Sequence, residues 1–245
     1  MGRAVAVIYA VVAYAAFLGT FLYMIGFLAN RVVPTSIDSG PEAPFGQALL
    51  IDVALLGLFA VPHSVMARQW FKKWWTGIVP TPVERSTYVM VSNLLLVLLL
   101  WGWRPMPDVI WEVQNSVGTT VLWALFGIGW TLVVLSSFII DHFDLFGLRQ
   151  VYLYARGKPY EPLSFKVSAL YKFVRHPLLL GWMIAFWATP RMTTGHLVFA
   201  IGTTAYMLIA IQVEERDLVK FHDGYADYRR RVPMLLPIFR GKGAS

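Results

Sequence analysis

The sequence predicts an all-α integral membrane protein, a bundle of five to six transmembrane helices. Hydrophobic residues make up 57% of the 245 positions and charged residues only 14%, against about 25% charged residues in soluble domains. Five apolar stretches have about the 20 residues that a helix needs to cross a bilayer core. Lysine and arginine are also spread unevenly over the connecting segments. Together these features indicate a single membrane domain that comprises residues 1–245.

The first predicted span, residues 4–29, carries no charge. It is longer than the apolar region of a signal peptide, which has roughly 7–15 residues, so we expect a retained helix. Further spans are expected at 47–66, 86–103, 117–140 and 194–213.

A sixth apolar stretch, 177–188, is short and ends at Thr189-Pro190. We expect it to form a helical hairpin with the last span, and whether it crosses the bilayer completely stays open. Apolar residues spaced along 163–174 indicate a short interfacial helix before it. No stretch has the pattern of a strand, which excludes a soluble Rossmann-type fold.

The basic residues predict the orientation. The segments 30–46, 104–116 and 189–193 hold one arginine each. Of the 21 lysines and arginines, these three leave 18 for the N-terminus and for the connections on the other side. By the positive-inside rule both termini, including the tail 214–245, are expected in the cytoplasm, most simply at a bacterial inner membrane.

Composition also excludes several functions. The formal charge of +7 suits loops that face anionic lipid, so the bilayer and not nucleic acid is the expected partner. The chain has no cysteine, which excludes disulfides, thiolate metal sites and a protein thiol nucleophile. No two histidines have the spacing of a ligand pair, so no metal site is predicted. The oligomeric state is not predicted.

Ionisable side chains inside a membrane are costly and are therefore candidates for function. The topology brings those of four separate stretches to one membrane level: His63 with Ser64, Asp141 with His142 and Asp144, Arg175-His176-Pro177, and Glu214-Glu215. Simpler roles remain possible for two of them. His63 follows Pro62 and can bond a freed carbonyl, and Asp141 or Asp144 can pair with Arg149.

The Arg175-His176-Pro177 sequence suits the start of a helix, because proline is tolerated in the first turn. Free backbone N–H groups and the positive end of the helix dipole would favour an anionic or carboxylate-bearing ligand there. Glu214 and Glu215 would suit an ammonium, a sulfonium or ribose hydroxyls. The spacing therefore suggests a cofactor with both kinds of group.

The C-terminal residues resemble the signature of the isoprenylcysteine carboxyl methyltransferase superfamily, which are integral membrane enzymes that use S-adenosylmethionine. The signature comprises Arg175–Gly181, Glu214-Glu215, Leu218, Phe221, Gly224-Tyr225, Tyr228, Val232-Pro233 and Pro237. Many members have tyrosine where this chain has Leu179. The resemblance implies a cofactor pocket formed by Tyr171, Arg175, His176, Pro177, Leu180, Gly181, Glu214, Glu215, Tyr225, Tyr228 and Arg229.

The upstream half resembles a narrower branch. Residues 61–68 and 142–150 are similar to bacterial methanethiol S-methyltransferases, which convert methanethiol to dimethyl sulfide. They are also similar to membrane proteins associated with nitrite and nitric oxide reduction. The resemblance implies methyl transfer from S-adenosylmethionine to a small thiol at the cytoplasmic side.

A thiol acceptor needs a base, because the thiolate is the nucleophile. His63, with Ser64 beside it, and His142 are the two candidates, and the choice between them stays open. Asp144 is expected to orient a histidine, and Arg149 to close the site.

Two other functions remain open. One is a carboxyl, amine or lipid methyltransferase of the same superfamily. The other is a non-enzymatic membrane factor in nitrogen-oxide metabolism.

Overall fold

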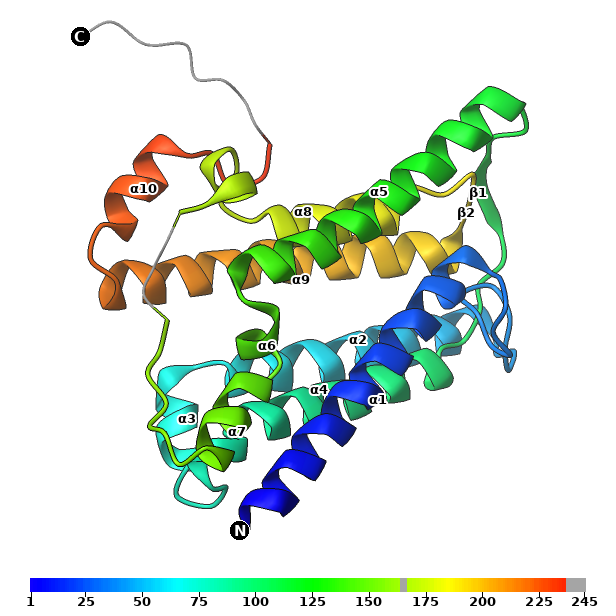
Figure 1. Cartoon of the computed structure of the whole chain (residues 1–245). Coiled ribbons are helices and arrows are strands. Elements are labelled where there is room, and N and C mark those ends of the chain that lie inside the picture. The colour runs from blue at the N-terminus through cyan, green and yellow to red at the C-terminus, as the bar shows by residue number, and fades with distance from the viewer. Residues whose placement is uncertain (164–166, 237–245) are drawn as a thin grey trace, which may run out of the picture.

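The chain is an all-α integral membrane protein. In a computed structural model the described residues, 1–163 and 167–236, form the elements shown in Figure 1. Five helices are long and apolar enough to cross a membrane. They are α1 (Arg3–Ala29), α2 (Phe45–Met66), α4 (Glu84–Gly102, preceded by the 3-10 turn Thr81–Val83), α5 (Ser116–Ile140) and α9 (Thr194–Phe221).

Shorter elements connect them. They are α3 (Gln69–Trp75), β1 (Val109–Glu112), α6 (His142–Leu145), α7 (Leu148–Ala155), a 3-10 turn (Ala169–Lys172), α8 (Pro177–Trp187), β2 (Arg191–Thr193) and α10 (Tyr225–Arg231). With 11 residues, α8 is about 16 Å long, half the thickness of a bilayer core.

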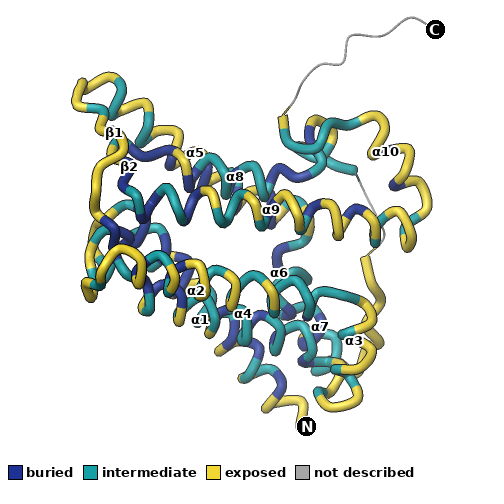
Figure 2. Tube along the Cα trace, turned by 180° about the vertical axis from the view of Figure 1, so that it is seen from behind, coloured by how far each residue is buried: buried dark blue, intermediate teal, exposed yellow. Residues whose placement is uncertain are grey.

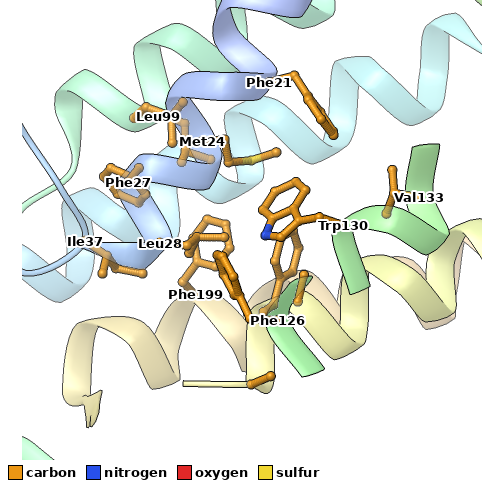
Figure 3. Close-up of a cluster of buried hydrophobic side chains, with 14 of the residues drawn as sticks. Phe21, Met24, Phe27, Leu28, Ile37, Leu99, Phe126, Trp130, Val133 and Phe199 are labelled. Atoms are coloured by element: carbon orange, nitrogen blue, oxygen red, sulfur yellow. The ribbon is translucent and has the colours of Figure 1, made fainter. Parts of the chain in front are cut away.

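The helices form two layers that converge at one end (Figures 1 and 2). One layer contains α1, α2 and α4, and the other contains α5, α8 and α9. Aromatic side chains join the layers: Phe21 of α1 lies edge-on against Trp130 of α5 and Trp182 of α8. Phe27, near the end of α1, and Phe199, near the start of α9, extend this core toward the end of the bundle that carries β1 and β2 (Figure 3).

The two ends of the bundle differ. We call the end with β1, β2 and residues 30–44 the sheet end, and the end with the N-terminus, α3, α7 and α10 the basic end (Figure 1). Connections alternate between the ends as the sequence predicts. Tyr154 of α7 donates a hydrogen bond to the carbonyl of Met1 at 2.9 Å, which fixes the start of α1 at the basic end.

The two strands correct the expectation that the chain has none. β1 and β2 pair in antiparallel fashion, with Glu112 opposite Arg191. Because α8 ends at Trp187, the chain up to Thr193 needs hydrogen-bond partners outside a helix. β1 provides them, and the Val113 N–H adds a bond to the Pro190 carbonyl at 2.8 Å. Strands of four and three residues are too short to show an alternating pattern.

The prediction of an interfacial helix at 163–174 is also wrong for the described residues of that segment. Residues 164–166 lie outside the described residues, and the following segment holds only the 3-10 turn Ala169–Lys172. Ala169 has φ 43°, a left-handed conformation that interrupts an α-helix. The last span was predicted to end at residue 213, but α9 extends eight residues further. Glu214 and Glu215 therefore lie inside a helix and not after it.

Candidate functional site

The centre of the candidate site is the buried carboxylate of Glu215, near the basic end of α9. Its side chain is 1% exposed, and it binds three cationic or donor groups. Arg175 approaches both oxygens, at 2.6 and 3.2 Å. His176 Nε2 lies 2.9 Å from Oε1, and Arg229 Nε lies 3.0 Å from Oε2. We call Glu215, Arg175, His176 and Arg229 the Glu215 cluster.

The cluster ties the tail to the membrane helices. The Arg175 guanidinium also donates to the carbonyls of Arg229, at 2.9 Å, and Val232. The backbone N–H groups of Arg175 and His176 donate to Pro233 and Met234, at 2.9 and 3.1 Å. These residues immediately precede α8, so the tail occupies hydrogen-bonding positions beside the start of that helix.

Glu214 has the opposite environment. Its side chain is exposed, and no hydrogen bond or ion pair joins it to another described residue. It lies close enough to the half-buried Tyr171 and the buried Tyr225 to act on them. Burial raises the pKa of both phenols; the Glu214 charge raises that of Tyr171 further, and the charges of Glu215 and Glu214 raise that of Tyr225 further. The Tyr171 hydroxyl is buried and has no hydrogen-bond partner among the described residues. A carboxylate and a hydroxyl are therefore both available to a ligand here.

Two tail tyrosines complete this region. Tyr228 is buried and donates a hydrogen bond to the Tyr171 carbonyl at 2.6 Å. Burial raises the pKa of Tyr228 to about 12. Tyr225 packs against it, with ring centroids 5.6 Å apart. The Tyr228 contact thus fixes the segment that carries Tyr171.

Residues in the first turns of α8 have two different roles: some form the start of the helix, and Gly181 packs against α5. Pro177 is the first residue of the helix, as expected, and Leu180 donates its N–H to the His176 carbonyl at 3.0 Å. Gly181 is buried against α5, where an added Cβ would meet the Gly129 carbonyl at 2.8 Å and the Val133 nitrogen at 2.9 Å. The absence of a side chain at Gly181 therefore allows α8 to pack closely on α5.

His63 belongs to a second polar group between α2, α4 and α9. Its Nδ1 lies 3.0 Å from the Ser92 hydroxyl, and its Nε2 lies 3.0 Å from the Tyr88 hydroxyl. The neighbouring Ser64 donates to Tyr206 of α9 at 3.2 Å. The His63 ring is only half-buried.

An ion pair connects this group to the turn of α9 that carries the two glutamates. Arg68, one turn after Ser64, binds Asp217 at 2.9 Å and the Ser64 carbonyl at 3.1 Å. Asp217 lies two residues beyond Glu215. The His63 group and the Glu215 cluster are therefore bound to the same end of α9.

His142 lies in a separate, aromatic environment. Its Nε2 is 2.7 Å from the Tyr14 hydroxyl and its Nδ1 is 2.8 Å from the Ser137 hydroxyl. The ring stacks on Phe138 with centroids 4.3 Å apart. Burial lowers the pKa of His142. Both nitrogens are occupied by α1 and α5, so this histidine fastens α6 between the two layers.

Asp144 and Arg149 bind each other, at 3.0 Å. Asp144 also accepts hydrogen bonds from Gln150 and Tyr160, and none joins it to a histidine within 1–163 and 167–236. The expectation that Asp144 orients a histidine is therefore not met. Asp141 caps α6 by accepting from the Asp144 N–H at 3.1 Å. No group of three metal-ligating side chains lies among the described residues.

Sequence reasoning missed three tyrosines: Tyr14 and Tyr88, which contact the candidate histidines, and Tyr206, which contacts Ser64. Tyr14, Tyr88 and Tyr206 stand inside apolar spans, where they look like ordinary aromatic residues. A hydroxyl away from the membrane interface, however, needs a hydrogen-bond partner. That rule could have identified them.

The fold and the Glu215 cluster define a class: an all-α integral membrane protein with a polar site at one end of its helices. Residues 51–226 match the family described as NnrU protein. The chain belongs to this family. No solved structure matches it significantly.

Individual relatives align over nearly the whole chain. The methanethiol S-methyltransferase of Mycobacterium tuberculosis is 56% identical over 238 residues, which cover 97% of this chain and 98% of the relative. That of Crocosphaera subtropica is 53% identical over 243 residues, or 99% and 95% of the two chains. Nurim of Sus scrofa is 30% identical over 222 residues, or 82% and 84% of the two chains.

Proposed function

We propose that the chain is a membrane methyltransferase that methylates methanethiol to dimethyl sulfide. The observation that carries the proposal is the identity of 56% to a methanethiol S-methyltransferase over 97% of the chain. The paired exposed and buried glutamates at the end of α9 support a site for a charged cofactor. We further propose that this end faces the cytoplasm, because the basic residues gather there.

The residues at the basic end fit S-adenosylmethionine, which would supply a methyl group on a cationic sulfur. In the Glu215 cluster one carboxylate faces two arginines, so the cluster keeps a net positive charge that suits the cofactor's carboxylate. Glu214 suits its cationic groups, and the unpartnered hydroxyl of Tyr171 can donate a hydrogen bond. Tyr225, beside Glu214, would close the site from the tail.

We propose His63 as the group that takes the proton from the thiol. It is half-buried, whereas His142 is 7% exposed. Both histidines have a hydroxyl group beside each ring nitrogen, so access from outside is what separates them. The Tyr88 hydroxyl is close enough to hold the His63 ring in place. In the proposed reaction His63 would take the proton from the acceptor sulfur, and the resulting thiolate would accept the methyl group that S-adenosylmethionine supplies when bound. Asp144 and Arg149 hold the segment after α6.

The test of the function is an assay with purified protein in detergent, S-adenosylmethionine and methanethiol, with dimethyl sulfide measured by headspace gas chromatography. Product that requires both cofactor and protein is expected. Cofactor binding without product would reassign the acceptor to a carboxylate, an amine or a lipid, with prenyl-cysteine as the first alternative. Neither binding nor product would reject the enzyme function and favour the non-enzymatic one.

The same assay tests His63. His63→Ala is expected to lower kcat by about 100-fold, the usual contribution of a general base. The loss should shrink as pH rises, because more of the acceptor ionises in solution. His142→Gln is the control and should keep the wild-type pH profile at permissive temperature. Equal activity of His63→Ala and wild type across pH would contradict the assignment.

A further inference from the structure

A hollow at the sheet end, far from the Glu215 cluster, has the features of an anion site. Its volume is about 460 Å³. Its polar lining includes Arg31 and Arg191, with Asn30, Ser36, Asp38 and Ser39 around them. The chain places only three arginines and no lysine in the connections at this end. Two of those three meet in one hollow.

Neither arginine has an anionic partner among the residues that the structure describes. Arg31 lies over the Trp123 ring, 5.3 Å from its centroid, and Arg191 lies in β2. Glu112 is opposite Arg191 across the β1–β2 pair. No ion pair within 4.0 Å joins either guanidinium to a carboxylate of the described residues. Positive charge at this end is disfavoured by topology, so unpaired arginines need another explanation.

The one acid in the hollow is already bound by neutral donors. Asp38 accepts from the Asn30 amide at 2.7 Å and from the Thr193 hydroxyl at 2.5 Å. Ser36 in turn donates to Asn30 at 2.6 Å. These bonds join the end of α1, the following loop and β2 into a fixed floor. With two guanidinium groups and one carboxylate, the hollow keeps one net positive charge.

We propose that the hollow binds a phosphate group between Arg31 and Arg191. Guanidinium groups match phosphate oxygens through pairs of N–H donors. Every phospholipid carries phosphate close to the depth of interfacial tryptophans. Trp123, which Arg31 covers, lies about two turns from the start of α5. The same chemistry also fits a small soluble phosphate ester, and the volume admits a glycerol group beside the phosphate. The site lies at the opposite end of the helices from the proposed active site.

The test compares an Arg31→Gln, Arg191→Gln double variant with wild type. Retention of phosphatidylglycerol is measured by native mass spectrometry, and thermal stabilisation is measured with inorganic phosphate and with glycerol 3-phosphate. We expect wild type to bind at least about fivefold more phosphatidylglycerol than the double variant. Stabilisation by the soluble phosphates without lipid retention would support the site and assign a soluble ligand.

Two controls keep the test decisive. Arg104→Gln removes the third arginine of the sheet end, which does not line the hollow, and should bind like wild type. If the double glutamine variant unfolds, the double lysine variant replaces it, because it keeps the charge and loses the paired donors. The proposal would be overturned if the variants of Arg31 and Arg191 retained as much lipid as wild type and responded equally to phosphate.

Discussion

At the scale of single residues, two adjacent glutamates have opposite environments because they lie on a helix. Neighbouring positions point about 100° apart around the axis. Glu215 is 1% exposed and bound by two arginines and a histidine, whereas Glu214 is exposed and unpaired among the described residues. One glutamate therefore holds the site together, and the other can contact a ligand.

Substitution by glutamine should separate these roles. Glu215→Gln leaves Arg175 and Arg229 without their counter-charge, and losing one partner of a buried pair costs about 3–5 kcal/mol. We expect a lower melting temperature in detergent and no detectable S-adenosylmethionine binding by calorimetry. Glu214→Gln should weaken binding and leave the melting temperature unchanged. A Glu214→Gln protein that melts early would contradict the division.

His142 should make stability depend on pH. Burial lowers its pKa below the ordinary 6.5, so the folded state prefers the neutral ring. Above 6.5 the ring is neutral in both folded and unfolded states. As pH falls below 6.5, the unfolded chain takes up the proton first, so the folded state loses stability until pH passes the folded pKa.

The measurement is the melting temperature from about pH 8 to about pH 5.5. Wild type is expected to lose more stability over this range than His142→Gln, which has no ring to protonate. His222→Gln is a control, since His222 lies at the end of α9, away from α6. A wild-type slope equal to that of His142→Gln would show that His142 does not contribute.

At the scale of elements, α5 and α8 touch through their backbones. A Cβ on Gly129 would come within 2.6 Å of the Ala185 nitrogen, and one on Gly181 within 2.8 Å of the Gly129 carbonyl. Small residues allow this approach in membranes, where packing replaces the hydrophobic effect between helices. The contact positions the start of α8, and with it His176.

Gly181→Ala should therefore force the helices apart. Overpacking of this kind costs about 1–3 kcal/mol, so we expect a lower melting temperature together with weaker cofactor binding. Gly127→Ala is the matched control, because a Cβ there meets nothing within 4 Å. Wild-type stability of Gly181→Ala would show that α8 can shift freely.

The sequence was enough to predict the long helices, because their apolar runs are set by bilayer thickness. Every predicted long span overlaps a helix, with most boundaries within two residues. It also identified Arg175, His176 and Glu215, which do come together. Pairing of Asp144 with Arg149 was one of the simpler roles that the sequence offered, and the two side chains do lie 3.0 Å apart. The sequence could not predict that Gly181 faces α5, because this depends on a contact between two helices and not on spacing within one.

At the scale of the whole molecule, the N-terminus and α10 lie at the same end of the bundle (Figure 1). Most lysines and arginines of the described residues also belong to the segments at this end. The positive-inside rule predicts that this end is cytoplasmic. The chain has no cysteine, so single cysteines can report sidedness without removing native ones.

Two variants test the orientation. Ser39→Cys at the sheet end should react with a membrane-impermeant maleimide in intact cells, and Asp223→Cys at the basic end should react only after lysis. Both side chains are exposed, so access to the reagent depends on the side of the membrane. Labelling of Asp223→Cys in intact cells would reverse the orientation.

The Glu215 cluster also implies an order of biogenesis. Its members come from the start of α8, the end of α9 and α10, and the tail carbonyls at 232–234 complete it. The five long helices contain their own backbone hydrogen bonds and can enter the bilayer one after another. A chain that stopped after Phe221 would therefore hold every long helix and lack part of the cluster. Insertion of the long helices and assembly of the Glu215 cluster are therefore separate steps, and the cluster can form only after the tail has been synthesised.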